Sequence, residues 1–240
     1  DFIDLDEHIV SGGVNLTQPV INRGAEHPVK LKAGAYAEYK TRQYRTRNFE
    51  YKWDVDAQLP AGFAERPTEE IMVAENLGID KIHVNDRTEN SDDYSANNHL
   101  EAVYAALDIP LNAFNIYVGA RLESFNTSVT SYGNVLNKVR DYNYTNVLPS
   151  LNATYDLRPG MLLRLAYGMS VNRPEFRELS PSTYEDFDMF SLVMGNPDLK
   201  QARIQNVDLR YEWYPASGEL VSLGAFYKYF QDPIDWPYPD

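Results

Sequence analysis

Apolar and polar residues alternate one for one along most of this 240-residue chain. In the clearest stretch every odd position from Val29 to Tyr39 is apolar or aromatic, whereas lysine and glutamate occupy most even positions from Lys30 to Lys40. Successive side chains of a strand point to opposite faces, so this pattern predicts strands with one dry face and one wet face. Helical periodicity is nearly absent, which predicts an all-β protein. The expected strands are residues 9–21, 28–44, 96–108, 113–125, 148–157, 161–172, 204–214 and 220–230.

The connections between these strands alternate between short and long. The short ones carry proline, and usually glycine, as tight turns require: residues 109–112, 158–160 and 215–218. The long ones are polar: residues 41–95, 126–143 and 172–203. In an antiparallel up-and-down meander this alternation places every short turn at one end of the sheet and every long loop at the other. Outer-membrane β-barrels have this arrangement.

Strand length and composition agree with a membrane barrel. A membrane-crossing strand needs about 9 to 11 residues, close to the length of most of these stretches. The longest apolar run, Ala102 to Leu107, is far too short for a membrane-spanning helix. Tyr, Phe and Trp together make up 13% of the residues and cluster toward strand ends, as in the aromatic girdles of barrels. We therefore expect the strands to form the wall of a transmembrane β-barrel.

The polar faces carry charges of both signs, which suits a water-filled lumen. The polar residues expected to face it in a structural role are Glu101, Arg121, Glu123, Arg164, Asp208, Arg210 and Glu212. The same alternation would also suit a soluble β-sandwich with one exposed face, and strand pattern alone leaves the two folds open. The alternating loop lengths favour the barrel.

Other classes of function find little support in the chain. A net charge of −13 argues against a nucleic-acid partner, which would need a basic face. Cysteine is absent, and the four histidines lack the spacing of a helical metal site. No nucleophile elbow or phosphate-binding loop occurs. We expect no enzyme activity, no catalytic residue, no metal and no cofactor.

One long connection offers a candidate for ligand contact. Residues 183–190 mix aromatic and acidic side chains in an expected outer loop, where rings could stack on a ligand and carboxylates could accept hydrogen bonds. The candidate contacts are Tyr184, Glu185, Asp186, Phe187 and Asp188. The alternative is that this loop only packs against its neighbours.

A succession of short motifs carries a family resemblance. Leu148-Pro149-Ser150-Leu151-Asn152 leads into a strand and a tight turn, and Asn172-Arg173-Pro174-Glu175-Phe176 follows the next strand. Gly195-Asn196-Pro197-Asp198-Leu199 then precedes Asn206-Val207-Asp208-Leu209-Arg210. In this order and spacing the motifs resemble the β-barrel of TonB-dependent outer-membrane receptors. The resemblance covers about residues 94–235, and the first ninety residues share only a compatible strand pattern.

The resemblance implies a bacterial outer-membrane protein for energised uptake of a scarce nutrient: an iron-siderophore, a corrinoid or an oligosaccharide. Barrels of this family have about 22 strands and a lumen filled by an N-terminal plug domain. The resemblance therefore implies that residues 1–240 form a single segment of a large transmembrane β-barrel. We expect the plug, and the segment that engages the TonB energy transducer, upstream of Asp1, so that the chain is a piece of a longer receptor. The expected partners are outer-membrane lipid, that plug, TonB and a small-molecule or oligosaccharide ligand. The alternative is a soluble or cell-surface β-domain for adhesion or carbohydrate binding.

Overall fold

Eight long strands form one antiparallel sheet in the computed structural model, which describes residues 2–21, 27–53, 61–78, 81–132, 138–186 and 191–235. They are β1 (Phe2–Ile21), β2 (Val29–Arg47), β5 (Tyr94–Leu111), β6 (Phe114–Ser131), β7 (Lys138–Arg158), β8 (Met161–Asn172), β11 (Ala202–Trp213) and β12 (Val221–Gln231). Each long strand is hydrogen-bonded to the next long strand along the chain. The predicted antiparallel up-and-down meander is therefore confirmed.

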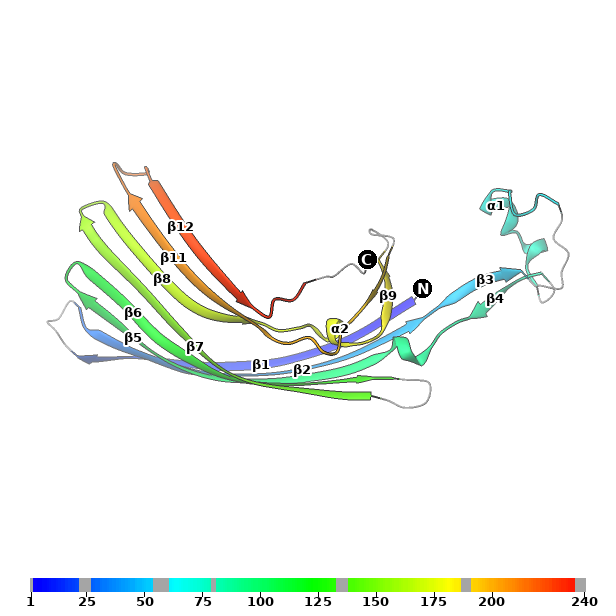
Figure 1. Ribbon diagram of the computed structural model, residues 1–240, viewed down its shortest axis with the longest axis horizontal. Coiled ribbons are helices and arrows are strands. Elements are labelled where there is room, and N and C mark those ends of the chain that lie inside the picture. Colours follow the sequence, from blue (N-terminus) through cyan, green and yellow to red (C-terminus); the bar gives the residue numbers. More distant parts are fainter. Residues whose placement is uncertain are drawn as a thin grey trace.

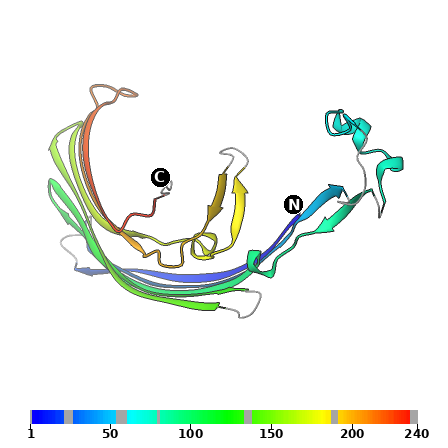
Figure 2. The same cartoon turned by 45° about the vertical axis from the view of Figure 1, so that its right-hand side comes forward.

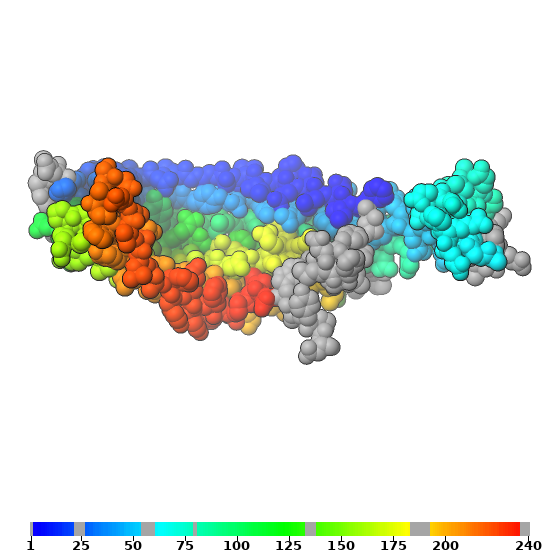
Figure 3. Space-filling model, turned by 90° about the horizontal axis from the view of Figure 1, so that it is seen from above, coloured from blue at the N-terminus to red at the C-terminus, as the bar shows by residue number. Residues whose placement is uncertain are grey.

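The sheet is curved into an open trough (Figures 1 and 2). Short turns lie at one end, where Asn112 (φ 46°) and Gly160 (φ 76°) adopt the left-handed backbone that tight reversals need. The long connections lie at the other end, so the turn at Arg158–Gly160 and strand β9 (Thr183–Asp186) are at opposite ends, as the meander requires (Figure 1). Figure 3 looks into the trough, with β1 along one edge and β12 along the other. Among the described residues these two edge strands do not pair with each other.

The strands extend beyond the predicted ranges at the end that carries the long connections. β6 continues to Ser131 and β7 begins at Lys138, so most of the expected loop 126–143 is strand. The expected strand 148–157 places Pro149 among the first residues of a strand, whereas it lies well inside β7. Pro149 pairs with Ala120 of β6, whereas the pairing of β7 with β8 begins only at Ser150. The missing N–H of proline is tolerated where only one neighbouring strand is present.

A small lobe, residues 49–92, continues β2 and β5 beyond the sheet; we call it the outer projection. It holds the paired strands β3 (Phe49–Trp53) and β4 (Ile82–Asp86), the helix α1 (Thr68–Ile71) and the 3-10 turns η1 (Ala74–Asn76) and η2 (Asn90–Asp92). Its small core contains Trp53 edge-on to Phe63 at 4.9 Å, and both Phe63 and Ile82 are buried. The projection has eleven acidic and four basic residues, so it carries −7 of the net charge.

The segment between β8 and β11 folds back onto the concave face of the sheet (Figure 1). It contains helix α2 (Phe176–Leu179) and the hairpin of β9 with β10 (Ser191–Met194). Phe176 and Leu179 of α2 are buried in one cluster with Tyr94, Ala96 and Val129 of β5 and β6. We call residues 173–201 the inner segment, because its described residues lie inside the trough.

The convex face carries an apolar belt over the half of the sheet next to the short turns. Its exposed large residues include Val103, Leu107, Val118, Leu122, Val147, Leu165, Leu209, Leu223 and Tyr227. In the described part of the chain the two small sheets are β9–β10 and β3–β4, and neither covers this belt. A sandwich would bury these residues against a second sheet, so the exposed belt favours a wall facing lipid.

Beyond the belt the apolar face changes sides. Past Leu122, the outward residues of β5 and β6 are polar: Ser95, Asn97, His99, Glu101, Ser124, Asn126, Ser128 and Thr130. On the same strands the concave face becomes apolar, with Tyr94, Ala96, Phe125 and Val129 buried. No helix in the described ranges has the length and hydropathy of a membrane span.

Candidate functional site

The concave face holds the polar residues around which the candidate site is built. The side chains that pack under α2 mark the concave face, and residues paired across neighbouring strands point to the same face. Because side chains alternate between the two faces along each strand, the register gives the orientation of the other residues. Six of the seven polar residues expected in the lumen lie on this face: Arg121, Glu123, Arg164, Asp208, Arg210 and Glu212. Their contact with a closed lumen stays a prediction, because the sheet described is open.

Glu101 is the exception, and its predicted orientation is corrected. It pairs with Ala37 and Ser124 and is exposed on the convex face, while its neighbour Ala102 is buried on the concave face. The stretch from Ala102 to Leu107 is apolar at every position, so alternation gives no indication of which residues point inward there. The flanking His99 shares the face of Glu101, and its ring lies 4.5 Å from that of Tyr39.

A first cluster lies next to the short turns and is centred on Glu212, which is buried. Its carboxylate is 3.0 Å from Arg164 Nε and 2.9 Å from Arg210 Nε, and Tyr214 OH donates to it at 3.1 Å. Arg164 and Arg210 are direct cross-strand neighbours, an arrangement in which like charges repel. The carboxylate between them offsets that repulsion, and Asp208 adds a second negative charge on the same face beside Arg210.

A second cluster ties the start of the inner segment to the wall. Glu123 is 6% exposed; Arg121 Nε donates to it at 2.7 Å, and Arg173 also contacts it. The Arg173 guanidinium lies 4.6 Å from the ring centre of Phe125, at cation–π distance. Arg173 follows directly after β8, so this contact sets the direction in which the chain leaves the sheet.

A third cluster holds α2 itself. Glu7 of β1 contacts Lys40 at 3.2 Å and also pairs with Arg42, and Lys40 lies 3.8 Å from Glu175. Lys40 Nζ and Arg42 Cζ each lie 5.3 Å from the ring centre of Phe176. Glu175 also begins α2 with a capping box that involves Glu178. These contacts join β2 directly, and β1 through Lys40 and Arg42, to a segment that follows them by more than a hundred residues.

The returning arm of the inner segment is anchored as well. Asn196 N–H donates to Glu178 O at 2.6 Å, and Tyr142 OH donates to Pro197 O at 2.6 Å. The buried amides of Asn146 and Gln201 exchange two hydrogen bonds, at 3.1 and 2.8 Å. Both ends of the inner segment are therefore fixed to the wall, and the β9–β10 hairpin lies between the two anchors.

The expected ligand loop falls on that hairpin. Tyr184, Glu185 and Asp186 belong to β9, which pairs with β10, whereas Phe187 and Asp188 lie outside the described residues. Their contact with a ligand stays a prediction. The anchors at Arg173, Glu175 and Lys40 were not expected as site residues, although Asn172-Arg173-Pro174-Glu175-Phe176 was noted as a motif. The motif is interpreted as a turn that ends a strand, and the sequence alone does not show that its charged residues contact the wall.

The described residues of the concave face form no cluster of metal ligands. Within the described ranges, no three His, Cys, Asp or Glu side chains come close enough to hold a metal ion. Each of the three clusters instead pairs carboxylates with arginine or lysine. Such groups can hold a mobile segment and attract charged solutes, and they do not form a nucleophile with its base.

Replacing Glu123 with glutamine is expected to loosen the inner segment. The change leaves Arg121 and Arg173 without a carboxylate, which should cost about 1 to 3 kcal/mol, toward the lower end because both arginines are partly exposed. Limited proteolysis of the full-length receptor in membranes should then cleave between Asn172 and Ala202 several times faster. Glu101→Gln, on the neighbouring strand and the opposite face, should leave the rate unchanged. Equal rates for both variants would show that the Glu123 cluster does not anchor the segment.

Comparison with known proteins gives one family and several similar folds. The family model described as TonB dependent receptor-like, beta-barrel matches residues 11–240. The ferric-catecholate import receptor Fiu from E. coli K12 has TM-score 0.60 and 14% identity over 93% of this chain and 31% of that chain. The alcaligin outer-membrane receptor FauA from Bordetella pertussis has TM-score 0.54 and 13% identity over 95% and 30% of the two chains.

A third similar structure, the copper transporter OprC, has TM-score 0.54 and 14% identity over 94% of this chain and 30% of that chain. No curated protein matches the chain. At these identities the solved structures show a shared fold and nothing further. The chain spans less than a third of the length of the three structures described, so it corresponds to one part of such a barrel.

Proposed function

Because the chain belongs to the TonB dependent receptor-like β-barrel family, we propose that it forms part of the wall of a receptor for energised uptake of a scarce nutrient. Proteins of this family are transport proteins of the bacterial outer membrane, which gives the convex apolar belt its lipid environment. The proposed cargo is an iron-siderophore, a corrinoid or an oligosaccharide. The proposed partners are a plug domain of the same protein and the TonB energy transducer.

One observation carries the proposal: the inner segment lies in the trough and is anchored at both ends, by ion pairs where it leaves the sheet and by hydrogen bonds where it returns. A loop in this position narrows the path along the concave face, and it contacts β2, β5, β6 and β7 at once. In a closed barrel these strands would surround the lumen, and the remaining concave charges would face a plug. Tyr184, Glu185, Asp186, Phe187 and Asp188 are the proposed ligand contacts on the same segment.

Uptake by cells that lack the full-length receptor tests the proposal. The probes are iron-55 bound to catecholate and hydroxamate siderophores, cobalt-57 cyanocobalamin, and growth on oligosaccharides as the only carbon source. Iron is tested first, because the similar structures include a ferric-catecholate import receptor. We expect at least a tenfold loss for one cargo class, restored by the cloned gene.

The energy requirement is the second part of this test. A protonophore should stop the restored uptake, because the proposed force on the plug comes from the energised inner membrane. Unchanged transport of every probe in the deletion strain, or restored uptake that persists with the protonophore, would contradict energised transport.

A further inference from the structure

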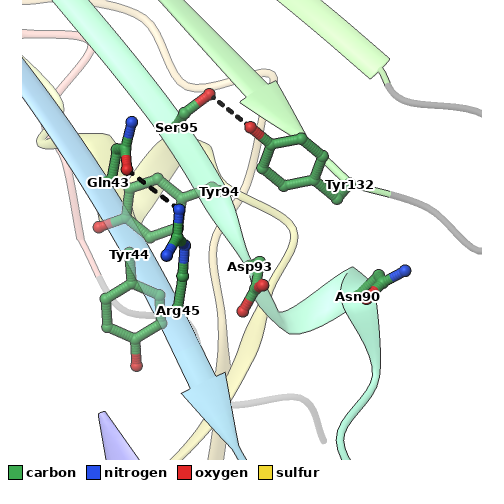
Figure 4. Close-up of a pocket in the computed structure, with 8 residues that line it drawn as sticks. All are labelled: Gln43, Tyr44, Arg45, Asn90, Asp93, Tyr94, Ser95 and Tyr132. Atoms are coloured by element: carbon green, nitrogen blue, oxygen red, sulfur yellow. Dashed lines mark hydrogen bonds between the residues drawn. The ribbon is translucent and has the colours of Figure 1, made fainter. Parts of the chain in front are cut away.

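A polar pocket lies at the outer ends of β2, β5 and β6, where the outer projection begins (Figure 4). Its volume is about 400 Å³, and turn η2 forms one of its sides. The side chains that carry the argument are Gln43, Arg45, Asn90, Asp93, Ser95 and Tyr132. This volume lies within the usual range of small-ligand sites.

The pocket opens on the convex face, away from the inner segment. Tyr44 and Tyr94 stack on each other at 5.0 Å and pack with α2 on the concave side. Gln43, Arg45 and Ser95 are their immediate neighbours on the strands, so these side chains point the other way. Tyr132 follows Ser131, the partner of Tyr94, and therefore also points outward. The pocket is thus separate from the proposed transport path.

Hydrogen bonds position the groups that line the pocket. Tyr132 OH donates to Ser95 Oγ at 3.0 Å, and Arg45 Nη2 donates to Gln43 Oε1 at 3.3 Å. Asp93 Oδ1 accepts from Thr46 N–H at 2.8 Å, which holds the carboxylate at the junction of β2 and β5. Gln43, Arg45 and Asn90 remain exposed to solvent. A ligand therefore meets planar amide, guanidinium and carboxylate groups together with an aromatic ring.

This chemistry selects among ligand classes. An apolar ligand would leave the polar lining unsatisfied. A highly charged anion would meet one arginine that Asp93 balances, beside a projection with charge −7. Sugar hydroxyls are both donors and acceptors, so they match amide, guanidinium and carboxylate groups in one site. The apolar face of a sugar ring can also lie against a tyrosine.

The height of the pocket above the membrane also favours a saccharide ligand. Arg45 lies six residues beyond Tyr39, the last aromatic residue on the convex face of β2, which is about 20 Å along the strand. For a strand tilted by about 45° this is about 14 Å in height, whereas the headgroup layer adds only about 5 to 8 Å on each side. In the outer leaflet, the sugars of membrane glycolipids extend into this layer.

We propose that this outward pocket binds a saccharide, either the sugar headgroup of an outer-leaflet glycolipid or a soluble oligosaccharide. Arg45, Gln43 and Asn90 hydrogen-bond its hydroxyls from the exposed side, and Tyr132 supports one ring face. The site holds the barrel in its sugar layer and takes no part in moving cargo. It is independent of which nutrient the receptor transports.

Binding to the purified full-length receptor tests this site. The probes are the soluble core oligosaccharide released from lipopolysaccharide, and lipopolysaccharide itself in nanodiscs; phosphatidylglycerol nanodiscs measure attraction to charge alone. Arg45→Ala and Gln43→Ala should each weaken binding about tenfold, because each removes hydrogen bonds to the ligand. Arg47→Ala is the matched control, since Arg47 lies on the same face of β2 but pairs with Asp86 outside the pocket.

The two probes separate the sources of the ligand. Similar affinity for both indicates recognition of the sugar alone, whereas a tenfold preference for lipopolysaccharide indicates the membrane glycolipid. Both outcomes support the site only if Arg45→Ala binds less than Arg47→Ala. Equal binding by these two variants would overturn the proposal. The same holds if Arg45→Ala weakens binding to phosphatidylglycerol nanodiscs as much as it weakens binding to the saccharide probes. Nutrient uptake by Arg45→Ala should stay at the wild-type rate, so failure here leaves the proposed transport untouched.

Discussion

Replacing Leu165 with arginine is expected to block insertion of the barrel, whereas Ser170→Arg on the same strand should be tolerated. Leu165 lies on the convex face near the middle of β8, between Ala153 and Leu209 of the neighbouring strands, and is 40% exposed. An arginine facing lipid near the bilayer midplane costs about 2 to 4 kcal/mol. Ser170 lies on the concave face, where an added charge meets water and the polar groups of β11.

The measurement is the fraction of full-length receptor that folds into phospholipid vesicles, read from the shift of the folded band on gels without heating. Met169→Arg separates the effect of side-chain orientation from the effect of depth in the bilayer. Met169 is adjacent to Ser170 but points outward, and it lies closer to the membrane interface than Leu165. The expected order of folding is Ser170→Arg best, Met169→Arg intermediate and Leu165→Arg worst. If Leu165→Arg folded as well as Ser170→Arg, the convex belt would not be the lipid surface.

Strand alternation predicts the sheet well wherever one face meets lipid and the other meets water. The stretch from Phe114 to Leu122 alternates cleanly, and β6 begins at Phe114 with these faces. Beyond Leu122, the strand carries serine, asparagine and threonine outward and still pairs on both sides. Serine, asparagine and threonine are also typical of loops, so the predicted strand 113–125 ends close to the end of the apolar belt. The hydrogen-bond ladder, which sequence does not display, continues further.

The change of apolar face along one strand also distinguishes this wall from a sandwich. In β6, Val118 and Leu122 point outward, whereas Phe125 and Val129 are buried on the concave face, Val129 in the cluster with α2. Both faces of a sandwich strand keep their environment along the whole strand, so its alternation does not change phase. A barrel wall that leaves the membrane loses its lipid on one face and can gain a covering loop on the other. The phase change therefore marks the outer boundary of the membrane.

The candidate site was predicted only in part, because its contacts link distant segments. The residues expected in the lumen come from strands, where parity gives their orientation. Lys40 of β2 contacts Glu175 at the start of α2, and Glu7 of β1 contacts Lys40; only the fold brings these three residues together. Those contacts depend on the register of five neighbouring strands, and this register cannot be read from a single sequence.

Gly195→Ala is expected to detach the returning arm of the inner segment. A Cβ at Gly195 would lie 2.5 Å from Arg177 O and 2.8 Å from Glu178 O, and it would also collide with Ser180 O. All three are backbone atoms at the C-terminal end of α2, so no side chain can move aside. The hydrogen bond from Asn196 N–H to Glu178 O should break as the chain backs away. Strain of this kind costs about 1 to 3 kcal/mol or more.

In the full-length receptor, Gly195→Ala should be cleaved between Leu179 and Asn196 faster than the wild type. The barrel itself should stay folded, because the clash lies in the trough and leaves the hydrogen bonds between the long strands intact. Gly168→Ala is the matched control, since a Cβ there meets nothing within 4 Å. A second readout is protection of the Tyr142 ring from chemical modification, which should fall once Pro197 moves away from its hydroxyl. If Gly195→Ala and Gly168→Ala were cleaved at the same rate, α2 and the returning arm would not be packed together, and the anchored inner segment would have to be abandoned.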